Sequence, residues 1–572
     1  MSRTRSLTGI LSAAVAALVL VPGTVATTTA SWPDEEWAHG AVETSSFRCG
    51  VDEGYASSST GRFLSGELLG QDLDSLLALR GVDLAVSPAG AVAVDPPTSI
   101  NQGSAPPAAT FTNPLTVSAL SGIVGLDLTG LTVGLPLGSA GAVNQYTQVA
   151  TTGTAAAASG LVSNSGGIGV TPTTPQTQLP QPATVALSTF LPSAAGITDA
   201  RLRVGAVASS ATLDGCAALR SALWGDGSVS GVVRSYGIAG LGLEIDSPLL
   251  GGLVTSVNSG LPTIQTAVNS LLGTNGLISS TIRSSVLASL VSGLGVGSMT
   301  GTVSLSGLDL AGSVSTLLAT PLTDGVVSID LSGGRIAVDL DALLGYTSTS
   351  LNTLPPNTEL VLNDAVVNAL VARIGALLDT WTTNIISALT EEIRTAVVTV
   401  DLRTTVSLLT GAVQLVRLDI DLVAPLSGLL DQTATFTIGT EVLGLVSVLN
   451  GLLAPLGINV NTLLSTLGGL ATGLVVPVAN IVTTTAIAAV TSLGSTLAAA
   501  TAPIVSALSL VVGALPEVLS LLANVQSSTP AVGDATPGFT VSALRIGLAP
   551  VIPGDVASLT FATSTVGPIS PP

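Results

Sequence analysis

The feature that most constrains this sequence is a long segment without charged side chains. Between Glu441 and Glu517 there is no Asp, Glu, Lys or Arg, and residues 474–513 lie in the middle of this window. A membrane-spanning helix needs about 20 mostly apolar residues, so length alone permits a span here. The alternatives are a buried core helix and a surface that associates with neighbouring molecules.

Three features of the window argue against a membrane span. Pro477 and Pro503 are expected to interrupt the helical hydrogen-bond ladder near both ends. No arginine flanks the window, so an orientation signal and an interfacial anchor are both missing. Hydroxyl side chains recur roughly once per helical turn: Thr483, Thr484, Thr485, Thr491, Ser492, Ser495, Thr496 and Thr501. We therefore expect buried or half-buried helices with a Ser/Thr solvent face that favours self-association. Membrane association through residues 442–516 is the alternative.

Charge is scarce along the whole chain, and this excludes several chemistries. Only 9% of the 572 residues are charged, the formal net charge is −19, and all sixteen basic residues are arginine. Without lysine there is no Walker-type phosphate loop, no Schiff-base nucleophile and no lysine–asparagine isopeptide cross-link. An acidic chain also repels phosphates, so we expect no nucleic-acid partner.

The N-terminus has the order of a secretory signal peptide, which we assign to residues 1–30. Arg3 and Arg5 precede the apolar run LTGILSAAVAALVLVPGTVA, and small residues follow. Cleavage after Ala26 or after Ala30 would suit the small-residue preference at such sites. An uncleaved anchor is the alternative. In either case the sequence predicts export to the cell surface or the medium.

Cys49 and Cys216 are the only two cysteines. In an exported protein two cysteines more often pair than stay free, so we expect a Cys49–Cys216 disulfide that closes a loop of about 167 residues. Two buried free thiols are the alternative.

Hydrophobic periodicity predicts an α+β fold, with a β-rich N-terminal region followed by repeated helix-plus-hairpin units. The stretch that begins at Asn363 is the clearest amphipathic helix, opened by an Asn/Asp cap. The segment GVVSIDLSGGRIAVDLD alternates around a Ser-Gly-Gly turn and predicts a hairpin. The expected divisions are a β-rich domain at 31–235 with Pro/Gly/Ser/Thr-rich loops at 95–114 and 164–182, helix/hairpin units at 236–350 and 351–437, and an uncharged helical unit with a terminal strand pair at 438–572.

Catalytic side chains are few. The one histidine is His39, and no G-x-S-x-G, EF-hand or zinc pattern is present. Paired carboxylates do occur at Asp72 and Asp74, Asp339 and Asp341, and Asp419 and Asp421. On a strand, residues i and i+2 share a face, so such pairs could serve a glycan hydrolase or bind calcium. We favour solvated strand faces and expect no catalysis, no cofactor and no metal.

Two further sets of residues are binding candidates. The tryptophans are too scattered for an obvious carbohydrate platform: Trp32, Trp37, Trp224 and Trp381. Arg201 and Arg203 share one face of an expected strand over residues 199–214, where they could meet acidic partners or simply be exposed.

Four stretches carry a family resemblance: GRFLSGELLGQDLDSLLALRGV (61–82), GAVNQYTQVATTGTAAAASGLVSNSGGIGV (141–170), RLRVGAVASSATLDG (201–215) and LTFATSTVGP (559–568). Together they resemble the choice-of-anchor G family of actinobacterial surface proteins. The resemblance implies an exported, surface-associated protein and carries no catalytic residues with it.

One departure from that family concerns anchoring. Family members typically continue into a C-terminal anchor such as LPxTG with an apolar span and a basic tail. The present sequence ends at GPISPP without these features, so covalent wall attachment does not follow, and release, non-covalent retention and truncation are the alternatives. Expected partners are cell-envelope components or other surface proteins.

Overall fold

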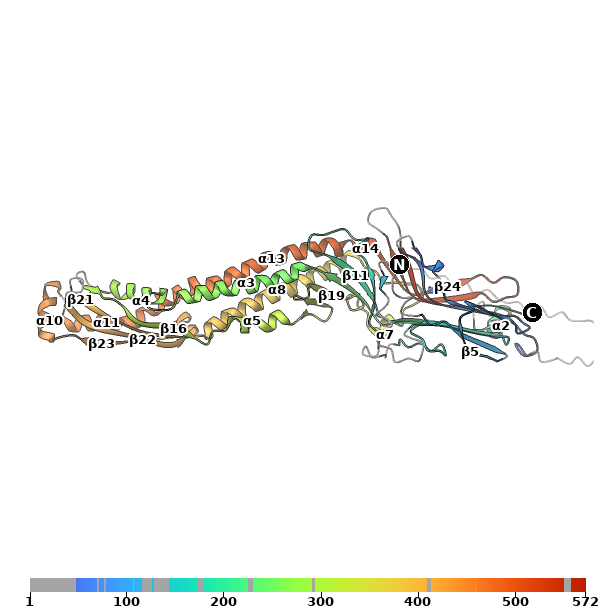
Figure 1. The fold of residues 1–572 in the computed structure, drawn as a ribbon, viewed down its shortest axis with the longest axis horizontal. Coiled ribbons are helices and arrows are strands. Elements are labelled where there is room, and N and C mark those ends of the chain that lie inside the picture. The colour runs from blue at the N-terminus through green and yellow to red at the C-terminus, as the bar shows by residue number, and fades with distance from the viewer. Residues whose placement is uncertain are drawn as a thin grey trace, which may run out of the picture. The chain divides into compact units, whose positions relative to one another are not determined.

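The computed structural model describes residues 48–571, except for 69–70, 77–78, 106, 116–125, 128–142, 172–173, 175–178, 225–229, 291–293, 409–412, 458 and 550–556. The expected signal peptide, His39, Trp32 and Trp37 lie outside the described residues. Residues 48–572 form one unit, in which several antiparallel sheets and long helices alternate along the chain (Figure 1). The expected α+β class is confirmed.

Strands from both ends of the chain build the largest sheet of the described residues, which we call sheet A. β1 (Ala56–Leu68) lies between β26 (Ala557–Ser570) and β3 (Val82–Val86), with Ser59 opposite Val566. The sheet order is β20-β24-β25-β26-β1-β3-β4, with β2 against β1. The other members are β2 (Gln71–Asp72), β4 (Val92–Asp95), β20 (Thr358–Glu359), β24 (Leu519–Thr529) and β25 (Gly538–Leu548). Sheet A thus joins strands from the expected first and last domains.

A second sheet, sheet B, packs face to face on sheet A and completes a β-sandwich: β1 and β26 contact β9, and β25 contacts β12 and β13. Its order is β13-β12-β9-β8-β6-β5. Its strands are β5 (Ile100–Ala105), β6 (Ala108–Thr112), β8 (Asn144–Ala150), β9 (Thr154–Gly160), β12 (Val207–Asp214) and β13 (Val232–Ile238), and α2 (Gly215–Trp224) follows β12. The prediction of a loop over 95–114 was wrong, because INQGSA and AATFT within it pair as the β5–β6 hairpin.

Small residues let the two sheets approach closely. At Gly61 of β1, a Cβ atom would lie 2.9 Å from the Tyr146 carbonyl oxygen and 3.0 Å from that of Ala158. The buried Ser209 and Ser564 hydroxyls, one from each sheet, lie 2.7 Å apart. The close approach of the two sheets explains why the strand sequences facing the interface are rich in Ala, Gly and Ser.

One amide side chain satisfies three backbone groups at this interface. Gln145 of β8 is fully buried, and its Oε1 accepts from the Phe63 N–H at 2.9 Å. Its Nε2 donates to the carbonyl oxygens of Arg80 at 3.0 Å and Asn113 at 2.8 Å. Gln145 therefore ties β1, the segment before β3 and the segment after β6 together.

We expect Gln145→Leu to lower the free energy of unfolding by about 2–3 kcal/mol, because it leaves buried backbone groups without partners. Gln148→Leu is the matched control, since Gln148 is half-buried in the same strand and its amide reaches only the Thr110 hydroxyl at 3.0 Å. Urea unfolding of the two variants measures the difference. Equal losses in both variants would contradict a special role for Gln145.

A third sheet, sheet C, connects the sandwich to the helices. Its order is β17-β18-β19-β14-β11-β10-β7. Its strands are β7 (Leu126–Asp127), β10 (Ala183–Ala186), β11 (Asp199–Val204), β14 (Leu241–Asp246), β17 (Leu322–Thr323), β18 (Val327–Asp330) and β19 (Arg335–Asp339). The expected hairpin around Ser-Gly-Gly is confirmed, with Asp330 paired to Arg335. The single strand expected over 199–214 was wrong: Gly205 and Ala206 separate β11 in sheet C from β12 in sheet B.

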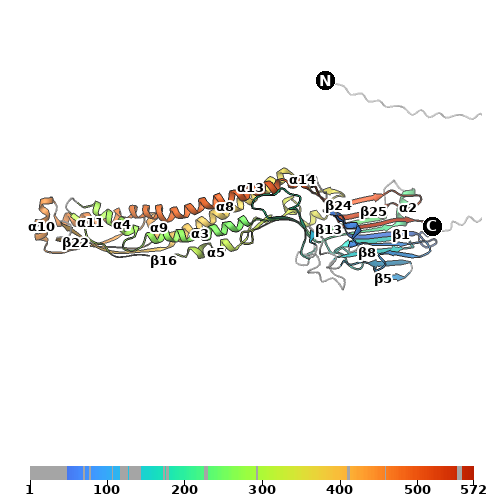
Figure 2. The same cartoon turned by 45° about the horizontal axis from the view of Figure 1, so that its top comes forward.

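Three long helices run side by side next to sheet C: α13 (Ala488–Gly513) contacts both α3 (Pro248–Ser270) and α8 (Asp364–Thr395), and α5 (Leu310–Ala319) packs on α8 (Figures 1 and 2). As predicted, Asn363 caps α8, and its side chain accepts from the Val366 N–H at 3.1 Å. The buried residues of α8 recur every three or four positions and form one helix face: Val367, Leu370, Ile374, Leu378, Trp381, Ile385, Leu389 and Ile393.

A fourth sheet, sheet E, lies farther along the helices. It has the order β15-β21-β22-β23, with β16 also against β21. Helices α4, α9, α11 and α12 contact it or one another over its buried face. The bounds are β15 (Leu294–Val296), β16 (Thr300–Ser306), β21 (Val397–Leu408), β22 (Val413–Pro425), β23 (Thr437–Val442), α4 (Leu277–Ala288), α9 (Leu426–Leu430), α11 (Val460–Gly473) and α12 (Val475–Val482).

Short helices complete the described elements. They are η1 (Leu73–Ser75), α6 (Leu340–Leu343), α7 (Ser348–Leu351), α10 (Val446–Leu453), η5 (Ala454–Leu456), a π-helical turn η6 (Thr483–Ile487) and α14 (Leu515–Val518).

The uncharged window folds into the helices α10 to α14. Pro503 has no N–H to donate to the ladder, as expected, but α13 continues through it, with Ile504 and Leu508 buried on the other helices. Packing of that face compensates for the missing backbone hydrogen bond. Val460–Val518 is the one stretch of the described chain that is long and apolar enough to cross a membrane by length and composition. Helix α13 buries one face against α3 and α8, as a core helix does.

Candidate functional site

The carboxylates of the first predicted pair, Asp72 and Asp74, bind nearby backbone and side-chain groups. The Asp72 side chain caps η1 by accepting from the Asp74 N–H at 2.8 Å. The Asp74 carboxylate accepts from the Gly66 N–H at 3.2 Å and pairs with Arg62 at 3.4 Å. Asp72 therefore caps the η1 turn, and Asp74 ties that turn to β1.

The second pair, Asp419 and Asp421, lies on one face of β22, as strand alternation predicts. Asp419 contacts Arg403 at 3.2 Å and Arg417 at 3.7 Å, and Arg417 also pairs with Glu441. Asp421 is exposed and lies opposite Asp401 of β21. This is a solvated strand face whose charges largely pair with one another.

The third pair departs from the strand geometry expected of it. Asp339 is the last residue of β19, and Asp341 belongs to α6, because the Asp339 side chain caps that helix by accepting from the Ala342 N–H at 3.0 Å. The Asp341 carboxylate accepts from the Leu241 N–H at 2.6 Å. Both line an open cavity of about 480 Å³ beside β14, β18 and β19, together with Arg203.

The surroundings of Asp341 favour its neutral form. Burial raises the pKa of its carboxyl to about 6, and the charge of Asp339 and a side-chain hydrogen bond with Asp339 act in the same direction, while the Leu241 N–H opposes them. The negative charge of Asp339 nearby thus adds to burial in disfavouring the ionised form of Asp341.

This geometry predicts a pH-dependent stability difference between the wild type and Asp341→Asn. The Asp341 carboxyl loses its proton at a pKa of about 4 in the unfolded chain but only near 6 in the folded chain. Stability from this group is thus greatest in acid and is lost as the pH rises from about 4 to about 6. Asparagine keeps the acceptor for Leu241 without the charge. Between pH 4 and pH 7 we expect the free energy of unfolding of the wild type to fall by on the order of 1–3 kcal/mol relative to that of the variant. Urea unfolding at both pH values checks this, and a constant difference between the proteins would contradict it.

Arg201 and Arg203 have acidic partners within the chain. Arg201 of β11 contacts Asp199 at 2.6 Å, Asp246 at 3.1 Å and Glu244 at 3.3 Å. Arg203 reaches Glu244 at 3.7 Å. Arg335 of β19 joins the same acids of β14, at 3.0 Å from Glu244 and 3.2 Å from Asp246. The interpretation of a merely exposed pair was wrong, because sheet pairing sets the two arginines beside the acids of β14.

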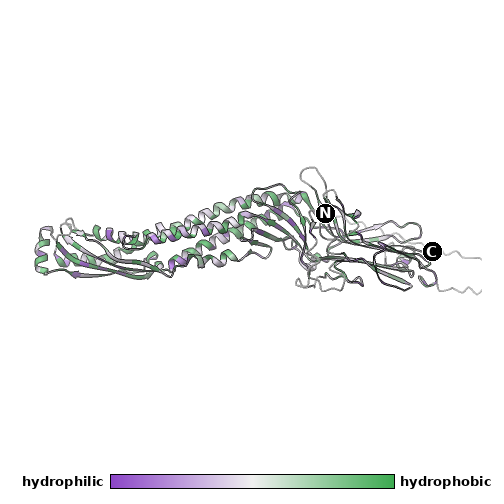
Figure 3. Ribbon diagram, in the orientation of Figure 1, coloured by the Kyte–Doolittle hydropathy of each residue, from purple (hydrophilic) through white to green (hydrophobic). Residues whose placement is uncertain are grey.

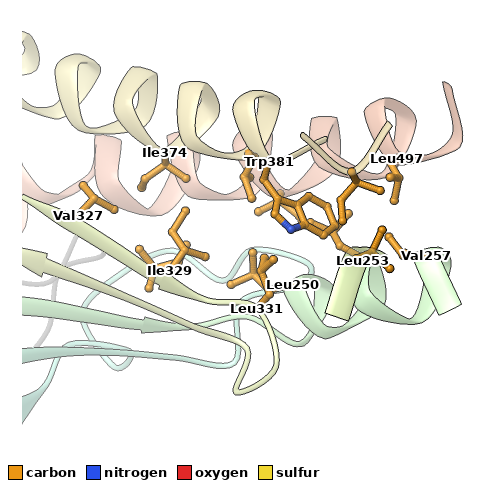
Figure 4. Close-up of a cluster of buried hydrophobic side chains, with 14 of the residues drawn as sticks. Leu250, Leu253, Val257, Val327, Ile329, Leu331, Ile374, Trp381 and Leu497 are labelled. Atoms are coloured by element: carbon orange, nitrogen blue, oxygen red, sulfur yellow. The ribbon is translucent and has the colours of Figure 1, made fainter. Parts of the chain in front are cut away.

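The remaining candidates are quickly placed. Trp381 is 1% exposed in the core among α3, α5, α8 and α13 (Figure 4), and the side chain of Trp224 lies outside the description. No cluster of three or more metal-ligating side chains occurs in the described part of the chain.

A disulfide joins Cys49, just before β1, to Cys216, the second residue of α2. Its partners are those predicted from the sequence. The Tyr55 hydroxyl lies 3.2 Å from the Cys49 sulfur, and the Cys216 sulfur faces the Thr152 carbonyl oxygen at 3.9 Å. The bridge therefore fastens the start of the described chain to the edge of the sandwich.

Comparison with protein-family models matches residues 59–567 to a domain of unknown function, DUF8394. The chain belongs to the DUF8394 family. Searches of curated proteins and of solved structures each found no match. The DUF8394 match begins within β1 and ends within β26, at residues that pair across sheet A, so the whole described fold corresponds to this one domain.

The DUF8394 domain also carries an apolar surface that sequence reasoning missed. Four large aliphatic side chains at α10 are exposed: Leu445 by 74%, Val446 by 47%, Val448 by 57% and Leu452 by 37%. We call these residues the α10 patch. The run LVSVLNGLL contains the signal, because its aliphatic residues outnumber those that one narrow buried face of an eight-residue helix can cover.

Proposed function

We propose that this chain is an exported protein of the bacterial cell surface or medium with a structural or binding role and no catalysis. The observation that carries the proposal is the Cys49–Cys216 disulfide, because such bonds persist in oxidising compartments outside the cytoplasm. The signal-peptide order of the first 30 residues and the resemblance to the choice-of-anchor G family point to the same location. Cell-envelope components or other surface proteins are the proposed partners.

The chemistry of the helix surfaces supports a role in contact. Exposed hydroxyls in the uncharged window donate to their own helix backbone: Thr484 to the Asn480 carbonyl oxygen at 2.9 Å, and Thr491 to that of Ile487 at 3.0 Å. Thr496 does the same to Ser492 at 3.0 Å. A surface whose donors are already satisfied loses few hydrogen bonds to water when a partner covers it. Self-association is the corresponding alternative to a foreign partner.

One observation favours a second candidate, a glycan hydrolase that uses Asp339 and Asp341. The raised pKa of Asp341 and the adjoining cavity are features of acid catalysis. The backbone contacts of the two carboxylates speak against it, because Asp339 caps α6 through the Ala342 N–H and Asp341 accepts from the Leu241 N–H. Incubation with cell-wall glycans tests this candidate: cleavage that disappears in both Asp339→Asn and Asp341→Asn would establish it in place of the binding role.

Cell fractionation tests the proposal directly. We expect the protein in the wall, membrane or medium fraction, with both cysteines resistant to alkylation until a reductant is added. A mainly cytoplasmic protein with two reactive thiols would overturn the proposal, whatever its binding properties.

A further inference from the structure

We propose that the α10 patch inserts into the uncharged surface of a lipid bilayer. Four exposed aliphatic side chains fall within eight residues, whereas the other large exposed aliphatic residues of the described chain are more dispersed. Isolated exposed aliphatic residues are common on proteins, but a cluster of this kind indicates a binding surface. Figures 1 and 2 place α10 at the end of the helices farthest from sheets A and B, and Figure 3 shows hydrophobic colouring there.

The exposed aliphatic side chains of α10 lie along both edges of its buried face. The Asn450 side chain accepts from the Val460 N–H at 2.8 Å and is thereby used to start α11. Leu449 and Leu453 are buried against the rest of the protein, and Val446, Val448 and Leu452 flank them on the helix, whereas Ser447 and Gly451 lie on the opposite side. The exposed aliphatic flanks have no cover within the described chain.

The size and composition of the α10 patch favour a lipid bilayer over a protein as its binding partner. Four aliphatic side chains present on the order of a few hundred Å², well below the about 800 Å² per partner of a stable dimer. The patch also lacks the aromatic, methionine and arginine residues that enrich protein interfaces. A bilayer demands neither a large matched surface nor such residues, because any aliphatic group gains by leaving water.

Charge favours an uncharged bilayer over an anionic one. No charged residue occurs between Glu441 and Glu517, and Glu441 is paired with Arg417. The chain as a whole is acidic and brings no basic residue to the patch, so anionic lipids add no attraction. Helix α10 has eight residues, about 12 Å of helix, so it is too short to cross the roughly 30 Å core and would lie in the interface.

Vesicle flotation of the mature protein tests the inference. We expect binding to phosphatidylcholine vesicles, no increase with added phosphatidylglycerol, and at least a tenfold smaller bound fraction for Val448→Asp. Val532→Asp is the matched control, because Val532 is 82% exposed between β24 and β25 and outside the patch. It should float like the wild type. Both variants change exposed residues, and equal thermal unfolding midpoints confirm that both fold.

Three outcomes would overturn the inference: no bound wild type, equal binding of Val448→Asp and wild type, or binding only to anionic vesicles. A dimer in solution that Val448→Asp dissociates would assign the patch to a second copy instead. The inference rests on the proposed export, but the two fail separately. If the protein is found outside the cytoplasm but does not bind vesicles, only the lipid-binding inference is wrong and the proposed export stands.

Discussion

Replacing Cys49 and Cys216 together by serine is expected to lower the free energy of unfolding by about 4–5 kcal/mol. The bridge joins residues 167 positions apart, and in the chain-entropy model a loop of that length restricts the unfolded chain by this amount. The folded protein keeps β1 in place through its pairing with β26 and β3, so the loss arises chiefly from a freer unfolded state.

Urea unfolding of the oxidised wild type, the reduced wild type and the double serine variant measures this effect. Reduced wild type and variant should unfold at the same urea concentration, well below the oxidised protein. If reduction leaves the midpoint unchanged, the long loop does not constrain the unfolded chain, and the stabilising role assigned to the bridge is wrong.

Trp381→Ala is expected to lower the free energy of unfolding by about 3–5 kcal/mol, the range for removing a large buried aromatic side chain. Trp381 lies where α3, α5, α8 and α13 meet, near Leu253, Val257 and Leu497 (Figure 4). Its Nε1 donates to the Leu317 carbonyl oxygen of α5 at 2.9 Å. Truncation therefore leaves a cavity and removes the donor from a half-buried carbonyl.

Trp381→Phe is the control that separates these two contributions. Phenylalanine retains most of the volume but cannot donate to Leu317, so we expect a loss of about 1–2 kcal/mol, the size of one buried hydrogen bond and a small volume change. A loss in Trp381→Ala no larger than in Trp381→Phe would show that the four helices close around the smaller side chain.

Elements with local signals could be predicted from the sequence. Helix α8 has a capping Asn363 at its start and apolar residues at helical spacing, and both come from neighbouring positions in the chain. The β18–β19 hairpin likewise contains its own turn. The chain has two cysteines and therefore one possible intrachain disulfide, so the pairing could be predicted from the sequence alone.

Features that depend on distant partners could not be predicted. No residue near Pro503 in the sequence indicates that α13 continues past this proline and packs on α3 and α8. The sequence pattern predicts that Asp341 is a strand residue, but the Asp339 side chain caps α6 and Asp341 belongs to that helix. Two of the three acidic partners of Arg201, Glu244 and Asp246, lie on β14, more than forty positions along the chain, and only the sheet register brings them to the arginine. The α10 patch was missed for a different reason, since an apolar run says nothing about whether both of its sides are covered.

The pairing of β1 with β26 has a consequence for the order of events during synthesis. Ser59 leaves the ribosome some five hundred residues before its partner Val566. If the chain is exported as proposed, β1 must wait outside the membrane, without its neighbour, until nearly the last strand has been translocated. Its sequence, ASSSTGRFLSGEL, suits that interval, because half of its residues are Ser, Thr or Gly and they keep the unpaired strand soluble. The last strand to arrive thus completes the sandwich.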